Sequence, residues 1–445
     1  MAVKHFHHAL KIRTETCFGC THCMKVCPTE AIRIRNGKAI IQENRCVDCG
    51  ECFKACPVKA IYIDQDDFER IKAFDYRIAL LPAVFTGQFS RRYNREQIYS
   101  AIEATGFTHI CEVEQSSELL AEQINKYAES NPAKKPLISS FCPAIIRLIQ
   151  VRFPSLVNNI MLLKPPLDIT ALYCRKKFTD EGVNPAKIGV FYITPCAAKI
   201  AAVKSPVGED YSMITGVINM DFLYNRVYHH LKNDHPTETK TAGERPLTPA
   251  STRWTLTHGE SDHFNGRSFA VDEIHNVIDF LEKVENDEIR NVDFLELRAC
   301  DESCAGGALT SANRFLIVER LRNTKPADIK IVEPSKKTID DYRSYLETRL
   351  AIQEIKPRPI MKLDDDMEEA MKKMDKVKEL MNILPGTDCA VCGAPTCQSF
   401  AKDIVQGDAD IRQCIFIQKS RENTGELALP DSLKLMKEIW GNEKF

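Results

Sequence analysis

The chain has 445 residues, enough for roughly two to four domains and at least one large hydrophobic core. With 60 basic and 62 acidic residues the formal net charge is −2, so the composition favours neither nucleic acid nor an anionic membrane as a partner. No apolar run reaches the ~18 residues of a membrane span, and residues 1–8 contain no apolar core of a signal peptide. A cytoplasmic location, away from the membrane, is therefore expected.

The sequence contains 18 cysteines, and disulfides would be unusual in a compartment that keeps thiols reduced. Sixteen of the cysteines fall into spacings typical of metal-cluster ligands. The remaining two, Cys111 and Cys174, are interpreted as ordinary buried residues. A metal-ligand interpretation therefore accounts for the regular spacing, which a disulfide framework leaves unexplained.

A four-cysteine run occurs twice near the N-terminus. Each copy has the pattern C-x2-C-x2-C-x3-C-P and is followed by a short β-like segment, at residues 31–34 and 60–63, and Asn36-Gly37 is typical of a hairpin turn. This is the pattern of bacterial two-cluster ferredoxins, in which the fourth cysteine of each run binds the other 4Fe–4S cluster. Structural zinc, the alternative, usually uses paired CxxC units. The predicted ligands are Cys17, Cys20, Cys23 and Cys56 for one cluster, and Cys46, Cys49, Cys52 and Cys27 for the other.

From Tyr76 to about Tyr345 the pattern is that of an α/β protein. Strands are predicted at residues 77–82 and 108–113, and amphipathic helices at 118–127 and 271–284. The polar stretch 232–260 is expected to be a long loop or a connection between lobes.

Three further strand-like runs end in cysteines. Residues 136–141 lead to Cys142, residues 188–195 lead to Cys196, and residues 294–299 lead to Cys300 and Cys304. Ligands of open α/β sheets gather beyond the carboxyl ends of the strands. We therefore predict that these four cysteines hold one buried metal cluster. Gly306 and Gly307 are expected to let the backbone approach a bulky group.

The C-terminal part begins with two predicted helices, at residues 340–355 and 364–381. The second carries a stripe of Met367, Ala370, Met371, Met374 and Val377, interpreted as a packing face, with a docking face for a second protein as the alternative. A final run places Cys389, Cys392, Cys397 and Cys414 at C-x2-C-x4-C-x16-C spacing. It resembles the small 4Fe–4S domain of corrinoid iron–sulfur proteins and of some membrane-linked ferredoxin oxidoreductases. A four-cysteine zinc site is the alternative.

Taken together, three segments resemble the cluster-binding motifs of iron-only (FeFe) hydrogenases: SSFCP at 139–143, TPCAAK at 194–199 and ELRACDESCAGG at 296–307. They are more similar to the sensory branch of that family than to its fast hydrogen-producing enzymes. The resemblance implies an α/β fold with four parts: a bacterial two-cluster ferredoxin domain at 1–66, a two-lobed hydrogenase-like catalytic domain at 76–350, a linker and amphipathic helix at 351–380, and a small α-rich 4Fe–4S domain at 381–445.

The active cofactor of that family, the H-cluster, is a 4Fe–4S cubane joined through one cysteine to a diiron unit with carbon monoxide, cyanide and a dithiolate bridge. The resemblance implies that Cys142, Cys196, Cys300 and Cys304 hold the cubane, with Cys304 as the bridging thiolate. It also implies that Lys199 donates a hydrogen bond to a cyanide. A buried ammonium needs an anionic partner, which such a cofactor supplies. A structural cubane without a diiron unit is the alternative.

The central motifs depart from those of the fast enzymes at three positions. Phe141 stands where those enzymes have a proton-relay cysteine, Arg298 replaces a methionine, and Ala202 replaces a glutamate. Because proton transfer needs groups within hydrogen-bond reach, the usual route is interrupted. Glu296, together with Glu260, is interpreted as a substitute route, and the alternative is that both are surface carboxylates.

These inferences predict a protein with three accessory 4Fe–4S clusters and an H-cluster. We expect it to interconvert H2 with protons and electrons slowly and reversibly, as a hydrogen or redox sensor with an electron-carrier or signalling protein as partner. One alternative is a non-catalytic electron-transfer or iron–sulfur assembly protein whose central site holds only a cubane. Another is an electron-transfer subunit of a larger hydrogenase complex. No GxGxxG follows a predicted strand, so no nicotinamide or flavin site is expected.

Overall fold

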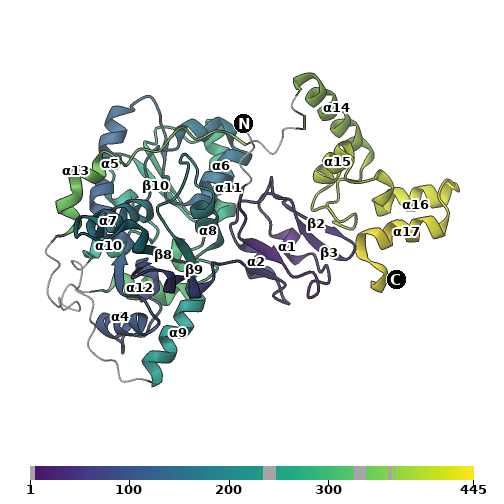
Figure 1. Cartoon of the computed structure of the whole chain (residues 1–445). Coiled ribbons are helices and arrows are strands. Elements are labelled where there is room, and N and C mark those ends of the chain that lie inside the picture. Colours follow the sequence, from purple (N-terminus) through teal and green to yellow (C-terminus); the bar gives the residue numbers. More distant parts are fainter. Residues whose placement is uncertain (1–5, 234–246, 325–336, 359–362, 365, 445) are drawn as a thin grey trace. The chain divides into compact units, whose positions relative to one another are not determined.

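The computed structural model describes residues 6–233, 247–324, 337–358, 363–364 and 366–444. The chain divides into two compact units, and Figure 1 shows its elements coloured along the sequence. The larger unit comprises residues 1–9, 64–149 and 155–357, and the smaller unit comprises residues 10–63, 150–154 and 358–445. Most of the predicted ferredoxin domain and the predicted C-terminal 4Fe–4S domain therefore share one compact unit.

Two parallel sheets form the centre of the larger unit. One has four strands in the order β6-β5-β8-β9, and the other has three in the order β10-β11-β7. Strands β5, β8 and β11 are buried along most of their length, because helices and loops cover both faces of a parallel sheet, whereas β10 is half-buried. The strand bounds are β5 Tyr76–Leu81, β6 His109–Glu112, β7 Leu137–Ile138, β8 Ile188–Thr194, β9 Gly216–Asn219, β10 Ser268–Val271 and β11 Phe294–Leu297.

Helices connect and follow these strands. Their bounds are α3 Ala83–Thr86, α4 Arg95–Ala104, α5 Ser117–Ser130, α6 Pro143–Arg152, α7 Pro166–Asp180, α8 Ala197–Lys204, α9 Met220–Asn233, α10 Pro249–Arg253, α11 Ile274–Glu285, α12 Arg314–Arg322 and α13 Arg343–Glu347. The predicted strands 77–82 and 108–113 are confirmed as β5 and β6. The predicted helices 118–127 and 271–284 are confirmed as α5 and α11. Part of the predicted loop 232–260 lies outside the described residues, and its described part contains α10.

The predicted helix over residues 340–355 is wrong for its second half. A single 3-10 turn leads into α13, which ends at Glu347, and the chain is then extended. Ala351 forms an antiparallel bridge with Leu163, and the Lys164 N–H donates to the Leu350 carbonyl at 2.8 Å. Pairing with a distant segment, which local periodicity cannot reveal, has overridden the helical pattern.

The smaller unit begins with two short antiparallel pairs. β1 (Leu10–Ile12) pairs with β4 (Ile61–Ile63), and β2 (Ile32–Arg35) pairs with β3 (Lys38–Ile41). Two short helices, α1 (His22–Lys25) and α2 (Glu51–Ala55), accompany them. Asn36 and Gly37 have φ values of 49° and 70°, so the predicted hairpin turn is confirmed as one with two left-handed residues.

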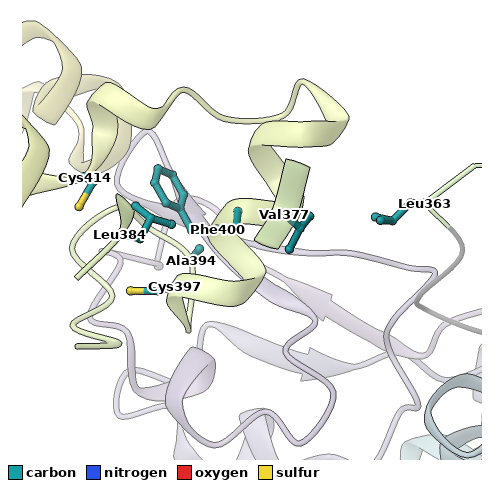
Figure 2. Close-up of a cluster of buried hydrophobic side chains, with 8 residues drawn as sticks. Leu363, Val377, Leu384, Ala394, Cys397, Phe400 and Cys414 are labelled. Carbon is teal, nitrogen blue, oxygen red and sulfur yellow. The ribbon is translucent and has the colours of Figure 1, made fainter. Parts of the chain in front are cut away.

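The C-terminal part of the smaller unit is helical. Its helices are α14 Met367–Ile383, α15 Cys397–Gln406, α16 Ile415–Thr424 and α17 Leu429–Trp440. Val377 and Phe400 belong to the buried cluster in Figure 2, against which Met374 packs. Met367 and Met371 are 78% and 64% exposed, so the interpretation of the methionine stripe as a packing face is wrong for its first two turns. None of the described helices is long and apolar enough to cross a bilayer.

Helix α11 provides a test of the packing in the larger unit. Leu281 is fully buried, so replacing it with alanine should lower the free energy of unfolding by about 2–5 kcal/mol. Lys283→Ala, exposed on the same helix, should change it by less than about 0.5 kcal/mol. Chemical denaturation of anaerobically purified protein measures both, and equal effects of the two variants would contradict this packing.

Candidate functional site

The central cysteines follow strands that belong to two different sheets. Cys196 follows β8 of the four-stranded sheet and is the N-cap of α8. Cys142 follows β7 and directly precedes α6. Cys300 and Cys304 lie on the loop after β11, and Cys304 is in a 3-10 turn, Ser303–Gly306. Each sheet therefore presents cysteines beyond the carboxyl ends of its strands, as the sequence predicts.

Two glycines shape the loop that carries Cys304. A Cβ on Gly306 would lie 1.9 Å from the Asp301 carbonyl oxygen, and one on Gly307 would lie 2.5 Å from the Pro195 carbonyl oxygen. The bulky group that these two glycines allow to approach is thus the backbone of the chain itself. Their close approach holds the loop against Pro195, the residue before Cys196, and so brings the second and third motifs together.

Three of the four central thiols interact electrostatically. Burial raises the pKa of the Cys196 thiol to about 12; Lys199 opposes this rise, and Cys304 and Cys142 add to it. Burial also raises the pKa of Cys142, with a contribution from Cys304. Cys300 is on the same loop as Cys304, and its carbonyl accepts the Ser303 N–H at 2.9 Å. The motifs therefore converge on one buried place.

Lys199 lies at the centre of this convergence. Its side chain is only 7% exposed, and its Nζ lies 3.7 Å from the Cys304 Sγ. Burial alone would lower the Lys199 pKa, but the neighbouring Cys304, Tyr192 and Cys196 side chains raise it above its usual value. The site thus keeps a buried ammonium charged, as an anionic cofactor would require.

A cavity adjoins Lys199. Its lining is largely apolar, and its charged groups are Lys199, Asp168 and Glu209. A largely apolar cavity with few charged groups suits a compact cofactor with small uncharged and anionic ligands. The other lining residues include Ser140, Phe141, Pro143, Ile146, Leu163, Leu167, Ala202, Val203, Thr255 and Ile352.

Two cations flank the Phe141 ring, which lies at this cavity. The Arg298 guanidinium carbon is 3.6 Å from the ring centroid, and the Lys199 Nζ is 4.4 Å from it. Arg298 is itself buried, with its Nη2 2.8 Å from a Glu260 carboxylate oxygen and its Nε donating to Glu296 at 3.3 Å. Phe141 therefore connects the three departures from the fast enzymes. Its ring contacts Arg298, and it lines the same cavity as Ala202.

Glu260 and Glu296 are 3% and 0% exposed, so their interpretation as surface carboxylates is wrong. Glu296 accepts the backbone N–H groups of Glu260 at 2.9 Å and Ser261 at 2.8 Å. Glu260 accepts the Ser139 hydroxyl at 2.6 Å. Burial raises the Glu260 pKa to about 7, although Arg298 works against this rise. The Ser139 hydroxyl thus connects Glu260 to the first motif.

Sequence analysis missed two other buried carboxyl groups. Glu114 is fully buried and accepts the Ala83 N–H at 2.9 Å, and burial raises its pKa to about 8. Asp168 borders the cavity, and burial raises its pKa to about 6. Glu114 directly follows the predicted strand 108–113, a signal that was available. Asp168 lies in an ordinary helical pattern and gave none.

Twelve of the other cysteines lie in the smaller unit, and those of residues 17–56 group as the ferredoxin pattern predicts. The pKa of Cys23 is raised to about 12. Burial is the largest cause, and the neighbouring Cys20, Cys17 and Cys56 add to the rise. Burial likewise raises the pKa of Cys52, to which Cys49 and Cys27 contribute. In the C-terminal run, burial raises the pKa of Cys392 to about 12, and Cys414, Cys389 and Cys397 add to this rise.

The donor sets suit iron–sulfur clusters. All 18 cysteines are free thiols, and neighbouring cysteines contribute to the raised pKa values of Cys23 and Cys392. Without metal, such crowding disfavours the thiolate form, whereas metal binding stabilises it. The individual ligand assignments, including Cys300 and Cys304, stay predictions.

Comparison with known proteins agrees with this site over the part that it covers. Residues 78–221 match the family described as "Iron only hydrogenase large subunit, C-terminal domain". Residues 16–61 match a 4Fe–4S dicluster domain, and residues 384–416 match a family of Fe–S cluster domains. The chain is thus an iron–sulfur protein that resembles FeFe hydrogenases and contains a ferredoxin-type domain. The first match ends before the third motif, at Cys300 and Cys304.

Two curated relatives share short stretches with the chain. One is the gamma component of the acetyl-CoA decarbonylase/synthase complex of Methanocaldococcus jannaschii, 32% identical over 80 residues, which are 17% of this chain and 16% of the relative. The other is a component of the ion-translocating oxidoreductase complex of Azoarcus sp., 50% identical over 38 residues, which are 8% of this chain and 21% of the relative. The chain therefore spans only a small part of these relatives.

Solved structures of FeFe-hydrogenase HydA1 from Chlamydomonas reinhardtii are also similar. Two of its variants match with 14% identity and TM-scores of 0.46 and 0.47. The matches cover 64% and 66% of this chain and 94% and 96% of the respective structures.

The cysteine groups predict the metal content. Four cubanes of about four irons each give about sixteen iron atoms per chain before any diiron unit is added. Elemental analysis of protein reconstituted without oxygen measures this ratio. About one zinc per chain, or about twelve irons, would remove the C-terminal cluster, and Cys111→Ser and Cys174→Ser should leave the iron content unchanged.

Proposed function

We propose that this chain is a slow hydrogenase-type protein that interconverts H2 with protons and electrons and acts as a hydrogen or redox sensor. The observation that carries the proposal is the convergence of Cys142, Cys196 and Cys304 on the buried, charged Lys199 beside a largely apolar cavity. A plain cubane would need four thiolates, but neither the ammonium nor the cavity.

In this proposal Cys142, Cys196, Cys300 and Cys304 hold a cubane, and Cys304 and Lys199 hold a diiron unit in the adjoining cavity. When bound, that unit supplies the place where H2 is split or formed. Lys199 orients it by donating a hydrogen bond to an anionic ligand. The apolar cavity walls keep bulk water away.

Proton transfer in this proposal depends on Glu260. Phe141 has no group that exchanges protons, and its ring lies between Arg298 and Lys199. Glu260 has a pKa raised by burial to about 7, so it can accept and release a proton near neutral pH. Glu296 holds Arg298 and the Glu260 backbone in place. This division of roles modifies the sequence-based one, which placed Glu296 in the relay.

Slow turnover supports sensing rather than hydrogen production. A route without the relay thiol is expected to limit the rate at every cycle. The accessory clusters of the smaller unit would pass the resulting electrons to a redox or signalling partner. The non-catalytic alternatives predict no carbon monoxide or cyanide vibrations after maturation with a synthetic diiron complex, so infrared spectroscopy separates them from this proposal.

Lys199→Ala tests how the diiron unit is held. The substitution removes a charged hydrogen bond, about 1.5–3 kcal/mol, so retention of the diiron unit should fall while the cubanes remain. Infrared bands and iron content after desalting measure both. The control is Lys204→Ala at the end of the same helix α8, which should retain the unit as the parent does. Equal retention in the Lys199 variant would exclude Lys199 as a cofactor contact.

Glu260→Gln tests the proton route. Turnover at matched cofactor loading should fall by ~10²- to 10⁴-fold, and the pH dependence near 7 should disappear, because glutamine carries no exchangeable carboxyl proton. Asp279→Asn, exposed on α11, is the matched control and should change neither.

Phe141→Cys alone should not restore fast turnover, since Ala202 still lacks the next carboxylate. A parent rate equal to that of the fast enzymes would refute the sensory assignment.

A further inference from the structure

The β2–β3 hairpin of the ferredoxin segment is bonded directly to the C-terminal cysteine run, within the smaller unit. The Ile34 N–H donates to the Gly393 carbonyl at 2.9 Å, next to Cys392. At the turn, the Asn36 and Gly37 N–H groups donate to the carbonyls of Glu438 and Ile439, each at 2.9 Å. Backbone bonds from β2 and from the turn thus join the hairpin to Gly393 and to α17.

Two glycines make this contact close. A Cβ on Gly393 would lie 2.3 Å from the Ile34 carbonyl oxygen, and one on Gly37 would lie 2.6 Å from the Trp440 carbonyl oxygen. Both residues also have positive φ, 76° and 70°. The contact therefore needs glycine on each side, for its conformation and for its lack of a side chain.

A buried ion pair reinforces the contact. The Arg33 guanidinium faces the Asp403 carboxylate with two nitrogens, one of them at 2.9 Å, and the two side chains are 3% and 2% exposed. Buried charges tolerate little displacement, because separating them leaves each charge uncompensated. The pair therefore fixes the register between β2 and α15, the helix that begins at Cys397.

The same hairpin also contacts a ferredoxin cysteine. The Ala39 N–H donates to the Cys17 Sγ at 3.4 Å, and the Lys38 ammonium donates to the Cys17 carbonyl at 2.6 Å. On the other strand, Arg35 donates to the Cys392 and Gly393 carbonyls at 3.4 Å and 3.2 Å. The hairpin thus contacts Cys17 through β3 and the Cys392 carbonyl through β2.

We propose that the β2–β3 hairpin is a fixed electron bridge between the cluster at Cys17 and the C-terminal cluster, and that Arg35 is a positioning residue that raises the reduction potential of the C-terminal cluster. One electron passes from the Cys17 cluster, which is oxidised, to the C-terminal cluster, which is reduced. No proton is transferred. The guanidinium beside the Cys392 loop stabilises the extra negative charge. The C-terminal cluster is then the electron outlet toward a partner. The inference rests on the proposed four-cluster content and not on hydrogen turnover.

Potentiometric titration of the full chain tests the role of Arg35, with dithionite as reductant and electron paramagnetic resonance as readout. The C-terminal signal is identified by its loss in Cys397→Ser. Arg35→Gln should weaken one-electron reduction of this cluster by up to about tenfold, a shift of about 59 mV to lower potential. Lys378→Gln, an exposed charge on α14, is the control and should cause no shift. An unshifted potential in Arg35→Gln, or zinc at this site, would overturn the proposal.

A pair of glycine variants tests the bridge itself. Gly393→Ala introduces the clash with Ile34. Gly407 has a φ of 84°, and a Cβ added there would have no atom within 4 Å, so Gly407→Ala introduces similar backbone strain without a clash. Magnetic coupling between the reduced C-terminal and ferredoxin clusters should persist in the parent and in Gly407→Ala and be lost in Gly393→Ala. Absence of coupling in the parent would refute the bridge even if Gly393→Ala fails to fold. Because dithionite supplies the electrons, a chain with no hydrogen turnover still gives the result, which separates this inference from the proposed function.

Discussion

The attraction between one buried ammonium and the thiols around it is the interaction on which the larger unit's site depends. Burial lowers the pKa of Lys199, and the neighbouring Cys304, Tyr192 and Cys196 side chains raise it above its usual value. The arrangement follows from two local features. Helix α8 begins at Cys196 and places Lys199 on its first turn, and Gly307 brings the Cys304 loop against Pro195. A charge held in this way is prepared for an anionic ligand before any ligand arrives, which is the usual meaning of a preorganised site.

The second constraint is the guanidinium of Arg298. It is among the largest fully buried side chains, and it lies between the Phe141 ring on one side and the Glu260 and Glu296 carboxylates on the other. Removing one partner of such a group leaves an uncompensated buried charge, so the phenylalanine, the arginine and the two glutamates are expected to vary together. The departure at Phe141 is therefore one part of a different, internally consistent arrangement.

Much of this organisation is visible in the sequence, because cysteine spacing and strand periodicity are local signals. The ferredoxin repeat predicts which thiols group together, and Asn36-Gly37 predicts the turn that joins β2 to β3. The errors occur where distant contacts decide. The chain after Glu347 is extended because Ala351 pairs with Leu163, and Met367 is exposed although its spacing is that of a packing face. Asp168 lines the cavity without any motif. The burial of Glu260 and Glu296 is another such effect, since their neighbours come from other segments.

The composition of the smaller unit has a consequence for the whole chain. Its two main segments, 10–63 and 358–445, are separated in sequence by nearly the entire larger unit, yet the Arg33–Asp403 pair and the Ile34–Gly393 bond join them. Closing so long a loop costs entropy, although this cost grows only slowly with loop length. The contact must therefore be favourable enough to hold these two segments together, and a buried bidentate ion pair with backbone bonds from β2 and the turn provides this. Two cysteine sites that lie far apart in the sequence consequently belong to one compact unit. A change at Gly393 is then expected to act on the ferredoxin segment as well as on the C-terminal run that contains it.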